Sequence, residues 1–308
     1  MKTENVSFYS DGIKIAGLLH TPDDSSFSQP WPALVQGPGW LGLKDAKLYK
    51  PFHERFTAAG YAVLVIDYRG FGESEGEKGI LMPEWQAQDI RNAITYAQSR
   101  SEIDKNRIGL FGSGGTGGGN AVLVAGIDER VKCAVCFHGV ANGRDWLRAM
   151  RREYEWIAFL ERVEENRKNR VLTGKSEMVD PREEIMVATP ERKKMNVKKD
   201  VDAKLTELIQ LRSAEAIMEY RPEDVVDQIS PRAIMFITVP HDVVTPEEQT
   251  LRMFHKAKEP KKLLFLNETT HYRVYADYLD EVTTEVIDWY NRYLTYSKVE
   301  KLGDNSCN

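Results

Sequence analysis

The sequence contains little cysteine and has no long run of apolar or of like-charged residues. Three cysteines in 308 residues cannot build a disulfide framework. No segment has the length and apolarity of a membrane span, and residues 1–9 lack the charged and apolar regions of a signal peptide. Lysine and arginine number 42 and aspartate and glutamate 47, a formal net charge of −5. We therefore expect a cytoplasmic protein that binds neither membranes nor nucleic acid.

Two of the cysteines are spaced as in metal or redox motifs. Cys133 and Cys136 form a C-x-x-C pattern inside 131–137, a segment that reads as a strand. Side chains three positions apart on a strand point to opposite faces of the sheet. The pattern therefore predicts core packing, and the sequence indicates no metal and no cofactor.

The order of apolar segments predicts an α/β fold. Two segments joined by Asp11-Gly12 read as an antiparallel hairpin. Beyond them, apolar strands alternate with amphipathic helices, which is typical of a mostly parallel sheet with helices on both faces. The expected strands are 6–9, 13–20, 33–36, 61–66, 107–111, 131–137, 233–239 and 262–266, and the expected helices are 51–59, 84–99, 120–125, 247–257 and 280–294.

The alternation of strands and helices breaks between residues 139 and 227. Residues 145–170 and 204–220 read as highly charged helices in which aromatic residues recur too often for a fully exposed surface. We interpret 139–227 as a helical cap inserted into a core made of 1–138 and 228–296, with 297–308 as a flexible tail. Two aromatic residues of this cap, Tyr154 and Trp156, are candidates for its own core or for a substrate pocket.

A glycine-rich segment lies near the centre of the predicted sheet. Residues 112–119 include six glycines and separate the strand 107–111 from the helix that begins at 120. Glycine allows positive φ and very close backbone packing. The segment is compatible with a nucleophile elbow, a dinucleotide-binding turn or a plain tight connection.

The dinucleotide interpretation is the weakest of the three. Gly112, Gly114 and Gly117 satisfy G-x-G-x-x-G, but the acidic residue expected about twenty positions later is missing from 131–135. A phosphate-binding P-loop is excluded because no Gly-Lys-Ser/Thr follows.

Two further polar residues follow strands of the predicted sheet. Asp242 comes after the strand 233–239, and His271 comes after the last strand, 262–266. The carboxyl ends of parallel strands meet at one edge of a sheet, so both side chains and the glycine-rich turn can converge there. The order of turn, acid and histidine is the order of nucleophile, acid and histidine in hydrolases of this architecture.

With these motifs, the chain resembles the α/β-hydrolase superfamily, most closely its dienelactone-hydrolase-like and cocaine-esterase-like branches. The resemblance covers residues 6–295 apart from the cap. It implies an α/β-hydrolase fold and a hydrolase that acts on an ester, lactone or similar bond. The motifs that carry it are Gln36-Gly37-Pro38-Gly39-Trp40, residues 67–76, the glycine-rich turn, His241-Asp242-Val243-Val244-Thr245-Pro246 and Thr270-His271-Tyr272.

The turn departs from the family pattern at the nucleophile. Counted from Gly112, the nucleophile slot of Gly-x-Ser-x-Gly-Gly falls on Gly114, which has no side chain. Ser113 fits if the turn begins one residue earlier, and it is our first choice. The second is that no covalent nucleophile exists, and the third is Thr116, whose β-branched side chain suits a strained elbow poorly.

The resemblance also implies roles for neighbouring residues. His271 would act as the base and Asp242 would fix its tautomer. Backbone amides at Gly39, Trp40 and Gly114 would hold an oxyanion. The remaining candidates, all for the pocket wall, are Gly115, His138, His241 and Tyr272.

Three functions stay open at the level of sequence. The first is a Ser113-Asp242-His271 hydrolase acting on a small, fairly hydrophobic metabolite. The second is general acid/base catalysis by His271 and Asp242 without a covalent nucleophile, for epoxide opening, lactone hydrolysis or cyclisation of a secondary metabolite. The third is a non-catalytic binding protein. A small molecule is the expected partner, and the oligomeric state stays open, with a homodimer among the compatible assemblies.

Overall fold

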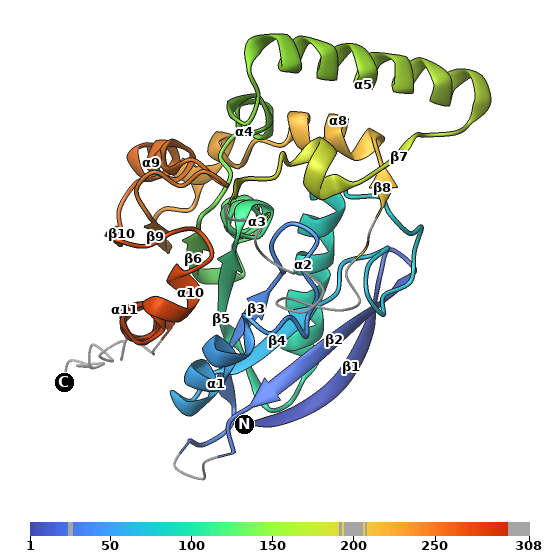
Figure 1. Cartoon of the computed structure of the whole chain (residues 1–308). Helices are drawn as coiled ribbons and strands as arrows, with labels where there is room; N and C mark the ends of the chain where they lie inside the picture. The colour runs from blue at the N-terminus through green and yellow to red at the C-terminus, as the bar shows by residue number, and fades with distance from the viewer. Residues whose placement is uncertain (24–26, 191–192, 194–205, 207, 295–308) are drawn as a thin grey trace, which may run out of the picture.

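The computed structural model describes residues 1–23, 27–190, 193, 206 and 208–294. Its centre is an eight-stranded sheet in the order β1-β2-β4-β3-β5-β6-β9-β10 (Figure 1). The predicted tail, 297–308, lies outside the described residues.

The sheet begins with an antiparallel hairpin. β1 (Lys2–Ser10) and β2 (Ile13–Thr21) pair along their whole length, and β2 also pairs antiparallel with β4 (Ala62–Ile66). The two turn residues have positive φ, 50° at Asp11 and 83° at Gly12. Two successive positive φ angles match the twist of a two-residue hairpin, which explains why this dipeptide marked the turn.

The other strands run parallel. They are β3 (Trp31–Gln36), β5 (Ile103–Ser113), β6 (Val131–Phe137), β9 (Ala233–Thr238) and β10 (Lys261–Phe265). β5, β6 and β9 are neighbours, so the residues that follow them lie at the same edge of the sheet. Helices cover both faces of the sheet, which agrees with strands whose sequences are continuous apolar runs.

Helices pack on both faces of the sheet. One face is covered by α1 (Lys50–Ala58) and α11 (Leu279–Leu294), and the other by α2 (Pro83–Ser99), α3 (Gly115–Ile127) and α9 (Glu247–Lys256). A short helix, α10 (Val274–Asp277), precedes α11. The predicted fold class is confirmed. Within the described ranges, no helix has both the length and the apolar character that a membrane crossing requires.

The two strand cysteines separate between the two hydrophobic cores. Cys133 packs in the core under α1 and α11, and Cys136 packs in the core under α2 and α3. Burial raises the pKa of the Cys136 thiol to about 12 and also raises that of Cys133. Both are therefore neutral packing residues, as the alternation of the strand predicts.

The segment between β6 and β9 carries most of the remaining structure. Its elements are α4 (Gly143–Ala149), α5 (Glu153–Thr173), β7 (Met178–Val179), η1 (Pro181–Ile185), β8 (Ile209–Gln210), α8 (Arg212–Glu219), η2 (Pro222–Asp224) and η3 (Val226–Gln228). α8 packs against α4 and α5, and α5 forms one end of the molecule (Figure 1).

Two expectations for this segment need correction. Residues 145–170 form two helices, because Arg152 is extended and its amide donates to Glu155, which starts a new helix at 153. Of the expected helix at 204–220, the described part is helical only from Arg212; residues 204, 205 and 207 lie outside the described residues.

The glycine-rich turn is much tighter than the sequence predicts. β5 continues through Ser113 and α3 begins at Gly115, so Gly114 alone separates strand from helix. The expected eight-residue connection over 112–119 is wrong. A Cβ on Gly112 would lie 2.2 Å from the carbonyl oxygen of Gly117, so these glycines serve the close packing of strand on helix. Their poor intrinsic helix propensity hid the helix start.

Candidate active site

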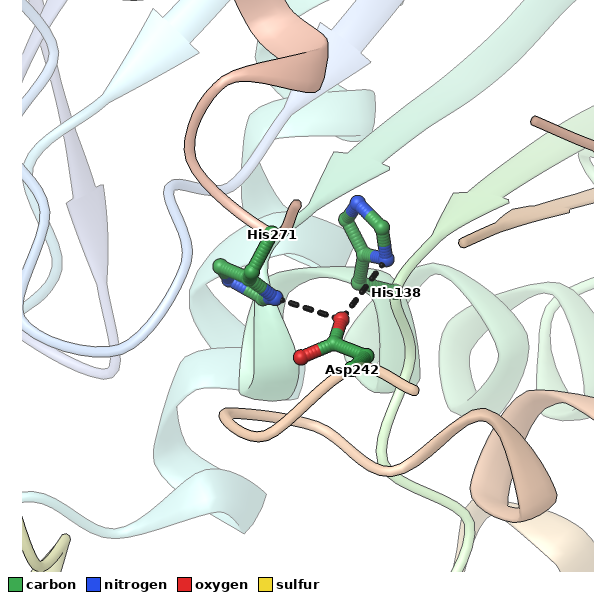
Figure 2. Close-up of side chains that lie close together, drawn as sticks. All are labelled: His138, Asp242 and His271. Atoms are coloured by element: carbon green, nitrogen blue, oxygen red, sulfur yellow. Dashed lines mark hydrogen bonds and ion pairs between the residues drawn. The ribbon is translucent and has the colours of Figure 1, made fainter. Parts of the chain in front are cut away.

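Asp242 follows β9 and is held by backbone amides. The N–H groups of Val244 and Thr245 donate to its Oδ1 at 2.8 and 2.9 Å. Its Oδ2 accepts from His271 Nδ1 at 2.7 Å (Figure 2). Burial by itself favours the neutral acid, but His271 and His138 outweigh it and hold the pKa of this carboxyl well below its usual range. Asp242 is therefore a fixed carboxylate that orients an imidazole.

His271 lies between β10 and α10, is 5% exposed and lines a cavity. With Nδ1–H directed at Asp242, its Nε2 carries the lone pair. The predicted acid and histidine thus lie in contact at the predicted edge of the sheet. Such an imidazole can remove a proton from water or from a substrate and return it.

His138 is a second imidazole on the same carboxylate. Its Nδ1 lies 3.2 Å from Asp242 Oδ2, and its ring centroid is 4.6 Å from that of His271 (Figure 2). It directly follows β6, is fully buried and has a φ of 55°. Burial, followed by the neighbouring His271, lowers the pKa of His138 to about 4. It is thus neutral at pH 7.

Among the residues that the structure describes, His138, Asp242 and His271 form the one group that could ligate a metal ion. Their candidate ligand atoms all lie within 4.8 Å of one another. Two nitrogens and one oxygen would suit a transition metal. Both imidazoles face Asp242 Oδ2 through Nδ1: His271 is hydrogen-bonded to it, and His138 Nδ1 lies 3.2 Å away.

A cavity of about 530 Å³ opens beside His271. Its wall is mainly apolar, which suits a small hydrophobic ligand. Besides His271, five expected residues lie on the wall: Gly39, Trp40, Gly114, Gly115 and Tyr272. The others are Leu41, Gly42, Lys47, Leu48, Tyr49, Pro51, Trp146, Arg182, Met186, Val244, Thr245, Tyr275, Ala276 and Leu279.

Gly114 occupies the elbow position of this site. Its φ is 69°, and it is the residue between strand and helix. A Cβ on Gly114 would meet nothing nearer than Gly39 Cα at 3.6 Å and Tyr275 Oη at 3.9 Å. There is room for a side chain at the point where a nucleophile would stand, and the sequence supplies none.

Ser113 and Thr116 have other positions. Ser113 is the last residue of β5, fully buried and absent from the cavity wall. Its hydroxyl makes no hydrogen bond of regular geometry, although the hydroxyls of Tyr49 and Tyr275 lie next to it. Thr116 Oγ1 accepts from the Trp40 amide at 2.8 Å, so it ties the loop after β3 to α3.

Two of the backbone amides that were expected to bind an oxyanion donate to side chains instead. The Trp40 amide donates to Thr116, and the Gly39 amide donates to Tyr49 Oη at 3.0 Å. The expectation that these two amides face a substrate oxygen therefore needs correction. The free amides of the first turn of α3, which begins directly after Gly114, remain as donors at this end of the cavity.

Besides His138, which is fully buried and absent from the cavity wall, three predicted pocket residues lie elsewhere. The His241 side chain is 96% exposed, because its φ of 54° turns it away from Asp242. Tyr154 is exposed on α5, and Trp156 is buried there against Phe159. None of these three lines the cavity, and the burial of Trp156 agrees with the other alternative, a place in the core of the inserted segment.

Sequence reasoning missed two tyrosines beside the elbow. Tyr49 precedes α1, and Tyr275 lies in α10, four residues after His271. Their rings line the cavity, and burial raises the pKa of both phenols. The proximity of Tyr275 to His271 in sequence was the available signal, but a tyrosine near a histidine carries little information by itself.

Three buried histidines make stability depend on pH. Burial lowers the pKa of His20 and His138 to about 4 and that of His53 to about 3. Because their folded pKa values lie below the unfolded value near 6.5, the unfolded chain binds more protons as the pH falls. We expect the free energy of unfolding to fall between pH 6.5 and 4, by up to about 1.4 kcal/mol per pH unit for each histidine. Urea unfolding at pH 7, 6 and 5 measures this slope; equal midpoints would contradict it.

Comparisons with known proteins agree with the fold. Residues 11–273 match the family described as X-Pro dipeptidyl-peptidase (S15 family). The uncharacterized 31.7 kDa protein in the traX-finO intergenic region of Escherichia coli is 28% identical over 271 residues, covering 85% of this chain and 91% of that protein. Polyketide transferase grgF of Penicillium sp. is 26% identical over 294 residues, covering 93% and 95%. The crystal structure of alpha/beta hydrolase GrgF from Penicillium sp. sh18 superposes with a TM-score of 0.81 at 23% identity, covering 96% of this chain and 100% of that one.

Proposed function

The chain belongs to the X-Pro dipeptidyl-peptidase (S15) family, and we propose that it cleaves an acyl bond without a covalent serine intermediate. It is a hydrolase of the α/β-hydrolase type. The predicted superfamily is thereby confirmed. The proposed bond is an ester, a lactone or a similar bond of a small, fairly hydrophobic compound. The observation that carries the proposal is Gly114, which leaves the elbow open beside His271.

The proposed reaction uses water directly. His271 Nε2 accepts a proton from a water molecule while the water oxygen bonds to the acyl carbon and the carbonyl electrons move onto oxygen. When the tetrahedral species collapses, the bond to the leaving group breaks and His271 returns the proton to the leaving oxygen. Asp242 stabilises the imidazolium between these steps. A substrate hydroxyl in place of water would give cyclisation or transfer by the same steps.

Several features support a hydrophobic substrate. The cavity wall is mainly apolar, and Trp146, Arg182 and Met186 of the segment between β6 and β9 contribute to it. This contribution supports the role of a cap for that segment. One relative is named a polyketide transferase, which is consistent with acyl chemistry on a metabolite of this kind.

The test uses p-nitrophenyl butyrate and a fluorophosphonate probe on the wild-type protein and on His271→Ala. We expect ester hydrolysis by the wild type, loss of at least about 100-fold in His271→Ala, and no covalent labelling of the wild type by mass spectrometry. Labelling at Ser113 would instead establish the covalent route. Equal hydrolysis by both proteins would reject a catalytic role for the histidine.

A further inference from the structure

The tyrosine of α10 occupies the space next to the open elbow. Tyr275 Oη lies 3.9 Å from the point where a Cβ would stand on Gly114, and the Gly114 amide and the Ser113 hydroxyl are its polar neighbours. The ring is fixed by aromatic contacts, with centroids 4.8 Å from Phe137 and 6.0 Å from Phe52. The hydroxyl thus points to the elbow from a rigid position.

Two of the amides expected to serve an oxyanion at the elbow are already engaged. The Trp40 amide is taken by Thr116, and the Gly39 amide is taken by Tyr49. Water attack on an acyl group places negative charge on the carbonyl oxygen, and this charge needs donors that are already in place. Gly114, His271 and Tyr275 line the same cavity, so an acyl group bound over Gly114 can meet both the imidazole and the phenol.

We propose that Tyr275 is a catalytic residue that donates a hydrogen bond from its phenol to the developing oxyanion. The inference rests on the proposed water-attack function. Burial raises the pKa of the Tyr275 phenol well above its usual range. The phenol therefore stays protonated at neutral pH, as a donor must, and is a poor nucleophile.

The experiment compares Tyr275→Phe with the wild type on p-nitrophenyl butyrate. Phenylalanine keeps the ring contacts, so the fold is preserved, and Tm measures this. We expect kcat to fall about 10- to 1,000-fold with KM changed less than about 3-fold, because the donor acts on the charged oxygen of the transition state. Tyr278→Phe is the matched control, because its hydroxyl donates to the Asn267 carbonyl at 2.6 Å and the residue is absent from the cavity wall.

Inhibitors separate a donor from a merely structural residue. A butyl phosphonate monoester carries a tetrahedral anionic centre, whereas butyramide is planar and neutral. Tyr275→Phe should weaken inhibition by the phosphonate more than about 10-fold and leave that by butyramide unchanged. An equal effect on both inhibitors, or an unchanged kcat, would overturn the role of Tyr275. His271→Ala reports on the proposed function separately, since activity independent of His271 would reject water attack whatever the tyrosine does.

Discussion

A fluorophosphonate is expected to label Gly114→Ser stoichiometrically, whereas the wild type is expected to remain unlabelled. A Cβ at this position meets its nearest atoms at 3.6 and 3.9 Å, which are ordinary contacts. The serine must adopt φ 69° and ψ 143°, a region populated mainly by glycine, at a cost of about 1–3 kcal/mol. Its hydroxyl would then stand in the cavity that His271 lines, where the imidazole can take its proton. Mass spectrometry of the intact protein measures the adduct.

Two further variants are controls for the expected labelling of Gly114→Ser. A Cβ on Gly115 would also make only ordinary contacts, at 3.5 Å from Thr245 and Trp146, but it lies one residue away from the elbow. We expect Gly115→Ser to fold and to remain unlabelled. Gly114→Ser combined with His271→Ala should likewise remain unlabelled. If Gly115→Ser reacts as well as Gly114→Ser, or if Gly114→Ser folds and does not react, the assignment of Gly114 to the nucleophile slot is wrong.

The sequence predicts the sheet and the acid–histidine pair for the same reason. Parallel strands buried on both faces, such as β6 and β9, are continuous apolar runs, and residues that follow such strands share one edge. Asp242 and His271 could therefore be placed together although 29 residues separate them. The position of this pair depends on the topology of the sheet, and the order of apolar segments along the chain predicts that topology.

The chemistry of the elbow depends on the directions of individual side chains. The hydrophobic periodicity of the sequence does not predict these directions. Glycines that pack a helix tightly on a strand have the same composition as glycines in a loop, so the start of α3 at Gly115 could not be predicted. The choice of Ser113 required its hydroxyl to face the site, but the residue continues the strand and is buried. His241 and Asp242 are neighbours in sequence, yet one positive φ exposes the first while the second is buried.

Asp242→Asn is expected to lower kcat for p-nitrophenyl butyrate about 10³- to 10⁴-fold while the protein stays folded. The amide keeps the size of the carboxylate, and its oxygen can still accept from Val244 and Thr245. The amide nitrogen would then face His271 Nδ1 and donate to it. The imidazole proton would move to Nε2, which could no longer accept a proton from water.

The tautomer explanation can be separated from a loss of charge. Asp277→Asn is the control, because Asp277 pairs with Arg273 at the surface of α10 and should keep its activity. Asp242→Asn should remain inactive at every pH between 6 and 9, because the donating amide keeps the proton of the neutral imidazole on Nε2. Asp242→Ala removes the donor as well and leaves His271 free to carry its proton on either nitrogen. If the alanine variant is more active than the asparagine variant, the carboxylate acts mainly by fixing the tautomer; if both retain more than about a tenth of wild-type activity, His271 does not depend on Asp242 for catalysis.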